Sequence, residues 1–265
     1  MSVKTFLTGL IILSLSLTSC SKFNRMQKSN DAQKKLDYAN ELYQNEKYNK
    51  AQQLYGQIKD SYKGTKKYEQ VFYNYAYTFY KMKDYTSAAF YFKNFVEVFP
   101  SSDKTEEMAY MEAYCFYMLS PRVELDQGET EKAISAMQTF INIYPSSEKV
   151  KEATEIIDKC RLKLERKGYR VAKLYYDLKY YKAAGVTFNN LLLDYPDSEK
   201  GDQYKFMAIK SYYKYADKSV VRKQKERYQE VITEYLSFKD FYPESNYMEE
   251  AETYYNSAKN HIKSL

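Results

Sequence analysis

Apolar residues recur along most of the chain at intervals of three and four positions, which is the period of an amphipathic α-helix. One segment carries Ala39, Leu42, Ala51, Tyr55 and Ile58, and the same offsets return in later segments. Four of the five prolines follow an aromatic residue, and successive pairs stand 45 to 51 residues apart. These pairs are Phe99-Pro100, Tyr144-Pro145, Tyr195-Pro196 and Tyr242-Pro243. Because the residue before proline avoids the α conformation, each pair predicts the end of a helix.

Small residues stand twelve positions apart at the places where two antiparallel helices would cross, and they let the helices approach closely. The clearest examples are Ala39 with Ala51, Ala76 with Ala88, and Ala172 with Ala184. Three residues before the second alanine stands a tyrosine, at the expected turn (Tyr48, Tyr85 and Tyr181). This arrangement resembles the tetratricopeptide (TPR) repeat. The resemblance predicts an all-α, right-handed TPR superhelix of about five helix pairs plus a C-terminal capping helix.

The helix pairs are expected over residues 31–64, 68–101, 104–146, 147–197 and 198–244, with the capping helix over 246–264. The third pair has an insertion from Pro121 to Gly128, which reads as a loop, and the fifth has one around Asp217 to Arg227. The fourth pair should begin with one long helix near 148–176, although Gly168 costs that helix about 1 kcal/mol. Because each pair covers its neighbour, we expect one continuous core over residues 31–265 and no separate domains.

The N-terminus has the pattern of an export signal. Lys4 precedes a mostly apolar run from Phe6 to Leu17, which is short for a membrane span of about 20 residues. The run ends in Leu17-Thr18-Ser19-Cys20, which resembles a bacterial lipobox. The resemblance implies that residues 1–19 are a signal peptide, that Cys20 carries the covalent lipid, and that residues 20–30 form a tether. It also implies a location on the periplasmic side of the outer membrane. An ordinary secretory signal with a chance cysteine is the alternative.

Composition excludes several classes of function. The net charge of +6 comes from 41 basic and 35 acidic residues spread along the chain, so nucleic acid is not an expected partner. The chain has one histidine, His261, and no cluster of Cys and His, so we predict no metal site. No catalytic motif is present, and we predict neither an enzyme nor a cofactor other than the lipid. Cys115 and Cys160 are expected to be buried thiols, with a disulfide as the alternative.

The chain has 32 tyrosines, and several fall on one stripe of the first helix of each predicted pair. The candidate peptide-binding concave face comprises Tyr43, Tyr73, Tyr77, Tyr80, Lys81, Tyr110, Tyr114, Tyr117 and Tyr176. With Lys35 nearby, such a face would suit a peptide carrying aromatic residues and a carboxylate. The alternative is that these tyrosines pack within the stack. A basic cluster of Arg222, Lys223, Lys225 and Arg227 is a candidate partner contact, or else a solvated helix face.

Taken together, the lipobox, the tether and the five helix pairs resemble the BamD family of outer-membrane protein assembly lipoproteins. The inserted segment Ser120-Pro121-Arg122 through Asp126-Gln127 and the segment 169–176 add to the likeness. The resemblance implies a non-enzymatic scaffold whose C-terminal repeats dock on the POTRA domains of a BamA-like barrel-forming subunit. Its N-terminal repeats would recognise unfolded outer-membrane proteins. The alternatives are another TPR envelope lipoprotein, such as a pilotin or a peptidoglycan-coordination scaffold, and a glycan-binding lipoprotein of the SusD type. The last is disfavoured because the chain has no Trp.

Overall fold

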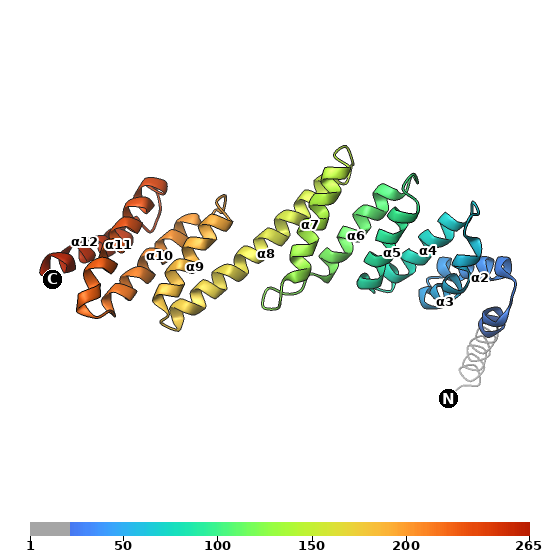
Figure 1. Ribbon diagram of the computed structural model, residues 1–265, viewed down its shortest axis with the longest axis horizontal. Helices are drawn as coiled ribbons and strands as arrows, with labels where there is room; N and C mark the ends of the chain where they lie inside the picture. The colour runs from blue at the N-terminus through green and yellow to red at the C-terminus, as the bar shows by residue number, and fades with distance from the viewer. Residues whose placement is uncertain (1–21) are drawn as a thin grey trace, which may run out of the picture. The chain divides into compact units, whose positions relative to one another are not determined.

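The computed structural model describes residues 22–265, so Cys20 and the expected signal peptide lie outside the described residues. Within this range the chain is built of α-helices joined by short turns, with a 3₁₀ turn at Lys59–Tyr62 and no β-strand (Figure 1). The labelled helices are α2 (Ala32–Gln44), α3 (Tyr48–Ile58), α4 (Tyr68–Lys81), α5 (Tyr85–Val98), α6 (Thr105–Leu119), α7 (Gly128–Ile143), α8 (Val150–Asp177), α9 (Tyr181–Asp194), α10 (Gly201–Asp217), α11 (Val221–Phe241) and α12 (Met248–Ser264). The predicted all-α, TPR-type class is confirmed.

The small residues lie where the sequence places them. Ala39, Ala51, Ala76, Ala88, Ala133, Ala172, Ala184 and Ala208 have no exposed surface. Bulky neighbours such as Phe92 and Phe188 are equally buried, so the helices of each pair are packed closely along their crossing. Each of the four aromatic–proline pairs follows the end of a helix, at the C-terminal side of α5, α7, α9 and α11.

The chain divides into two compact units. Unit 1 comprises the described residues up to Pro121 together with Asp126–Cys160, and unit 2 comprises Arg122–Leu125 and Arg161–Leu265. Two clusters of buried residues belong to unit 1 and a third to unit 2. The reason lies in α8, where residues 161–167 are mostly charged and supply few apolar side chains to a shared core.

The two cysteines are both buried, in different clusters. Cys115 lies with the residues of the first three helix pairs and Cys160 with a cluster built on α6, α7 and α8. Cys115 is a free thiol, and burial raises its pKa to about 12. It therefore remains protonated and unreactive at neutral pH.

Helix α8 runs unbroken from Val150 to Asp177, as expected from its apolar period. Gly168 has a packing role in this helix, because a Cβ there would meet Leu191 Cδ2 of α9 at 2.6 Å. The loss of helix propensity is thus offset by a close approach of α8 and α9. The insertion in the third pair is a loop, as predicted. The insertion in the fifth pair lengthens α10 and α11 instead, leaving only a short turn between them.

A serine two positions after each of the four prolines joins successive helix pairs, a feature that the sequence reading overlooked. Each hydroxyl donates to a carboxylate about one repeat earlier in the chain, and each also accepts a backbone N–H at the start of the next helix. The pairs are Ser102 with Glu69, Ser147 with Glu106, Ser198 with Glu165, and Ser245 with Asp202. The capped amides belong to Lys104, Lys149, Lys200 and Tyr247. The repeated sequence is therefore aromatic–Pro–x–Ser.

The strongest of these contacts should be the one at Ser198. Glu165 is buried, and its Oε1 accepts from Ser198 Oγ and Tyr204 Oη, both at 2.5 Å. Ser198→Ala should lower the free energy of unfolding by about 1–3 kcal/mol, because a buried carboxylate loses a donor. Ser147→Ala is the matched control, since it loses the same amide cap but its partner Glu106 is exposed. Equal losses in urea unfolding would show that burial of the carboxylate is irrelevant.

Close packing of α9 against α10 depends on Gly185. A Cβ at this position would lie 2.9 Å from Tyr212 Cζ, in a ring held within the core. Gly185→Ala should therefore destabilise the protein by about 1–2 kcal/mol, because overpacking exceeds the gain in helix propensity. Gly56→Ala is the control, because its Cβ would meet Tyr75 at an ordinary 3.5 Å. That variant should be stabilised by about 0.5–1 kcal/mol in thermal or urea unfolding, and a stabilised Gly185→Ala would contradict the packing argument.

Part of the expected tether is ordered. Residues 22–28 are helical and lie against the first helix pair. Phe23 is buried, with Lys50 Nζ 5.2 Å from its ring centroid. Met26 packs on the same cluster, and Gln27 Nε2 donates to Gln53 Oε1 at 3.0 Å. These two apolar residues, three positions apart in a polar segment, give the helix its contact with unit 1.

Candidate binding surfaces

Seven of the predicted tyrosines come together in unit 1, on the first helices of the first three pairs. This tyrosine ladder consists of Tyr43, Tyr73, Tyr77, Tyr80, Tyr110, Tyr114 and Tyr117. Ring centroids lie 4.7 Å apart for Tyr73 and Tyr77, and 6.2 Å apart for Tyr77 and Tyr80. The ladder passes from α4 to α6 between Tyr80 and Tyr114, at 6.4 Å. Tyr114 then contacts Tyr110 at 5.9 Å. These tyrosines therefore form a cluster of contacting rings, and their role in peptide binding stays a prediction.

A carboxylate lies at the centre of the ladder. Glu107 of α6 accepts hydrogen bonds from Tyr73 Oη, at 3.0 and 3.3 Å, and from Tyr77 Oη. Burial, reinforced by Glu107, raises the pKa of Tyr73 to about 12 and moves that of Tyr77 upward as well. Both phenols thus remain protonated donors at neutral pH. The two lysines expected beside the tyrosines do not form a basic flank as predicted. Lys35 Nζ donates to Gln57 Oε1 at 2.8 Å, and Lys81 is exposed at the end of α4.

Packing explains part of the ladder. In three pairs the tyrosine near the end of the first helix meets the tyrosine that begins the second helix, edge to face. These pairs are Tyr43 with Tyr48 at 5.4 Å, Tyr80 with Tyr85 at 5.7 Å, and Tyr176 with Tyr181 at 5.4 Å. Tyr176 belongs to unit 2, so the structure does not bring it into the ladder. Tyr176 matches the predicted stripe because it makes the same contact at the turn as Tyr43 and Tyr80 do.

The tyrosine–tyrosine contact at the turn within these pairs does not explain the other positions of the ladder. Tyr73 and Tyr77 of α4 correspond to Tyr110 and Tyr114 of α6, whereas the first pair has Leu36 and Asn40 at the same offsets. Tyr110 is buried against the core, but Tyr73, Tyr77 and Tyr114 are half-buried and keep part of each ring accessible. Most of the accessible part of the ladder therefore lies in the second and third pairs, and Tyr43 of the first pair is also half-buried. The ladder offers aromatic faces beside a negatively charged centre.

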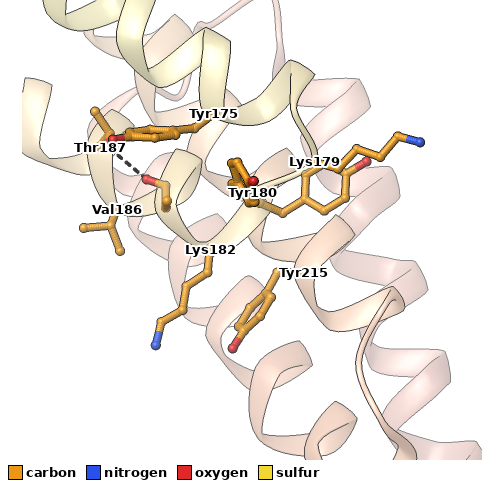
Figure 2. Close-up of a pocket in the computed structure, with 9 residues that line it drawn as sticks. Tyr175, Lys179, Tyr180, Lys182, Val186, Thr187 and Tyr215 are labelled. Atoms are coloured by element: carbon orange, nitrogen blue, oxygen red, sulfur yellow. Dashed lines mark hydrogen bonds between the residues drawn. The ribbon is translucent and has the colours of Figure 1, made fainter.

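Unit 2 contains an open groove with a volume of about 680 Å³, which the sequence reading missed. Its lining comes from the end of α8, the first half of α9 and the end of α10, and includes Tyr175, Lys179, Tyr180, Lys182, Val186, Thr187 and Tyr215 (Figure 2). Tyr180 is 62% exposed and Val186 is 42% exposed, so both side chains are available to a partner. The only signal in the sequence was the pair of tyrosines at 180 and 181, of which 181 was assigned to the turn.

Basic residues surround this groove. Lys179 and Lys182 belong to its lining, and the Arg227 guanidinium lies 4.0 Å from the centroid of the Tyr215 ring. The predicted contact residues Arg222, Lys223, Lys225 and Arg227 lie in the first two turns of α11, and Arg227 is the one that contacts the groove lining. Lys223 pairs with Glu226 at 2.9 Å, in a surface contact that leaves the region basic. An apolar groove with a basic rim suits a partner segment that carries apolar and acidic side chains.

The fold and these surfaces define a helical-repeat scaffold of the TPR class, a type that binds other proteins through stacked helix pairs. A family model described as "YfiO: Outer membrane lipoprotein" matches residues 28–224. The chain therefore belongs to the YfiO (BamD) family of outer membrane lipoproteins, and the resemblance expected from the sequence is confirmed. No helix among residues 22–265 has the length and apolar character needed to cross a bilayer.

Two other comparisons add little to this assignment. The solved structure of the TPR2AB domain of yeast Sti1 in complex with pHSP90 is similar over 86% of this chain and 98% of its own, at 14% identity and a TM-score of 0.39. At that level the similarity carries no argument about function. No curated protein sequence matches the chain.

Proposed function

We propose that the protein is a lipid-anchored scaffold of the β-barrel assembly machinery, which helps to recognise and insert outer-membrane β-barrel proteins. The observation that carries this proposal is the family match over residues 28–224, joined to the lipobox that ends at Cys20. In this proposal Cys20 is acylated and the repeats face the periplasm. The protein acts by holding other chains and performs no chemical step.

The two surfaces support a division of labour. The groove and the start of α11, in unit 2, are proposed to hold a BamA-like barrel-forming subunit through its POTRA domains. The ladder, in unit 1, is proposed to hold segments of unfolded outer-membrane proteins. Such segments alternate apolar and polar side chains, so aromatic residues on one face could lie against Tyr77 and Tyr114. Glu107 disfavours a peptide carboxylate at the centre of the ladder, so a client would contact it with neutral or basic residues.

A crosslinking pull-down from native membranes tests this proposal. The tagged protein, crosslinked in cells and purified after membrane solubilisation, should recover the barrel-forming subunit as its main partner. Recovery of a pilus secretin, or of peptidoglycan-linked proteins, as the main partner would contradict the proposal and favour the other envelope roles of TPR lipoproteins. The same preparation, treated to release ester-linked fatty acids, should show whether the lipid is present on the N-terminal cysteine.

A further inference from the structure

The first described residues leave unit 1 at a defined place. Lys22 pairs with Glu41, near the end of α2, at 2.8 Å. The next residue, Phe23, is covered by Lys50 from the first turn of α3. The N-terminal end of the helix 22–28 therefore lies beside the turn that joins α2 to α3. In the sequence, Cys20 precedes Lys22 by two residues.

The α4–α5 turn lies at the same edge of unit 1 as the α2–α3 turn. Successive helices contact one another in the order α2, α3, α4 and α5, and the short turns make them antiparallel neighbours. The helices α2 and α4 consequently end at one edge, which we call the anchor edge. The two turns also share a conformation, since Glu46 has φ 59° and Lys83 has φ 63°.

The anchor edge carries cations that are not neutralised by the protein. Lys47, Lys81 and Lys83 are exposed there, and within the described part of the chain they form no ion pair. The acidic residues near this edge include Glu46, Glu41, which pairs with Lys22, and Asp84, which is the N-cap of α5. At the opposite edge of unit 1, several lysines form ion pairs. Those pairs are Lys63 with Asp60 at 3.0 Å, Lys104 with Glu69 at 3.0 Å, and Lys149 with Glu152 at 2.8 Å.

We propose that the anchor edge of unit 1 lies against an anionic phospholipid surface and that the docked helix 22–28 fixes this orientation. The inference rests on acylation of Cys20 in the proposed function, which brings the edge to the membrane. Free lysines then supply a second, electrostatic attachment to acidic headgroups. A flexible tether would leave unit 1 free to rotate, whereas a helix packed through Phe23 and Met26 keeps one edge toward the bilayer.

The absence of Trp from the sequence permits a direct test of this orientation. We would place one tryptophan at Thr86, exposed beside the α4–α5 turn, and in a second protein at Ser101, exposed just beyond the other end of α5. The 14 residues of α5 separate the two sites by about 20 Å. Each lipidated, full-length mature protein is bound to phosphatidylglycerol vesicles that contain a headgroup-spin-labelled phospholipid. Quenching of the Thr86→Trp fluorescence should exceed that of Ser101→Trp by at least about twofold.

A charge-reversal variant tests whether the lysines contribute to this orientation. Lys47→Glu, Lys81→Glu and Lys83→Glu, combined with Thr86→Trp, should keep the thermal stability but lose the excess quenching. Equal quenching of the two reporters in proteins that float with the vesicles would overturn the orientation while leaving the anchor intact. Failure of the mature protein to float with neutral or anionic vesicles would instead refute the lipid anchor, and the proposed orientation with it. Retained quenching in the charge-reversal variant would refute the role of the lysines.

Discussion

Removing the exposed apolar side chains of the unit 2 groove should release the barrel-forming subunit from the protein. Tyr180→Ser and Val186→Ser together remove two side chains that are 62% and 42% exposed in the isolated chain, so folding should be little affected. If they anchor a partner, each should cost roughly 2 kcal/mol of binding, and the pair should lower recovery of the subunit by about 100-fold or more. Co-purification from solubilised membranes, normalised to the bait, measures this loss.

The matched control removes apolar residues of similar size that lie away from the groove lining. Leu193 of α9 and Phe241 of α11 are 79% and 78% exposed, and neither belongs to the lining. Leu193→Ser with Phe241→Ser should leave recovery of the subunit unchanged. If the control loses the partner and the groove variant keeps it, then the groove is not the docking surface. Comparable melting temperatures for the two variants would ensure that the difference arises from binding.

The second large effect is expected at the tyrosine ladder. Replacing Tyr73, Tyr77 and Tyr114 by Ser should lower affinity for peptides from unfolded outer-membrane proteins by about 100-fold, because the accessible aromatic surface is lost. The same rings pack on one another, at 4.7 Å for Tyr73 and Tyr77, so stability should also fall. Fluorescence anisotropy with labelled peptides measures affinity, and urea unfolding measures stability. Unchanged affinity with collapsed stability would show that the ladder serves packing alone.

A milder variant separates the rings from their hydroxyls. Tyr73→Phe with Tyr77→Phe retains both rings and removes the hydrogen bonds to Glu107. The ring surface remains, so peptide affinity should change by less than about tenfold. Stability should fall by about 0.5–1.5 kcal/mol, because the hydrogen bonds from the two phenols to the exposed Glu107 carboxylate are lost. Affinity that falls as far as in the serine variant would instead assign recognition to the hydroxyls.

The sequence was sufficient for the fold because its signals are local and repeated. Alanines twelve positions apart, with an aromatic residue before each proline, specify where two helices cross and where the second one ends. Gly168 did not interrupt α8, because the glycine gains a close contact with Leu191. The division into two units could not be predicted in this way, since it depends on which faces of the charged segment 161–167 find apolar partners.

The candidate surfaces were predicted less completely, for a physical reason. Helical spacing placed Tyr73 and Tyr77 on one face, but Glu107 stands 30 residues beyond Tyr77, and only the packing of α6 on the preceding pair brings it between them. Helical spacing also cannot show that Tyr176 contacts Tyr181 across the turn between α8 and α9. It therefore predicts Tyr176 as part of the tyrosine ladder, to which this residue does not belong. The groove is formed by the end of α8, the first half of α9 and the end of α10, a combination that no single segment of sequence can reveal.

The central claim, that this lipoprotein serves the assembly of outer-membrane β-barrels, is tested most directly by depleting it in growing cells and quantifying the outer-membrane proteome. We expect β-barrel proteins to fall together in the outer membrane while other lipoproteins remain at normal levels. Normal amounts of folded β-barrels after depletion would contradict it.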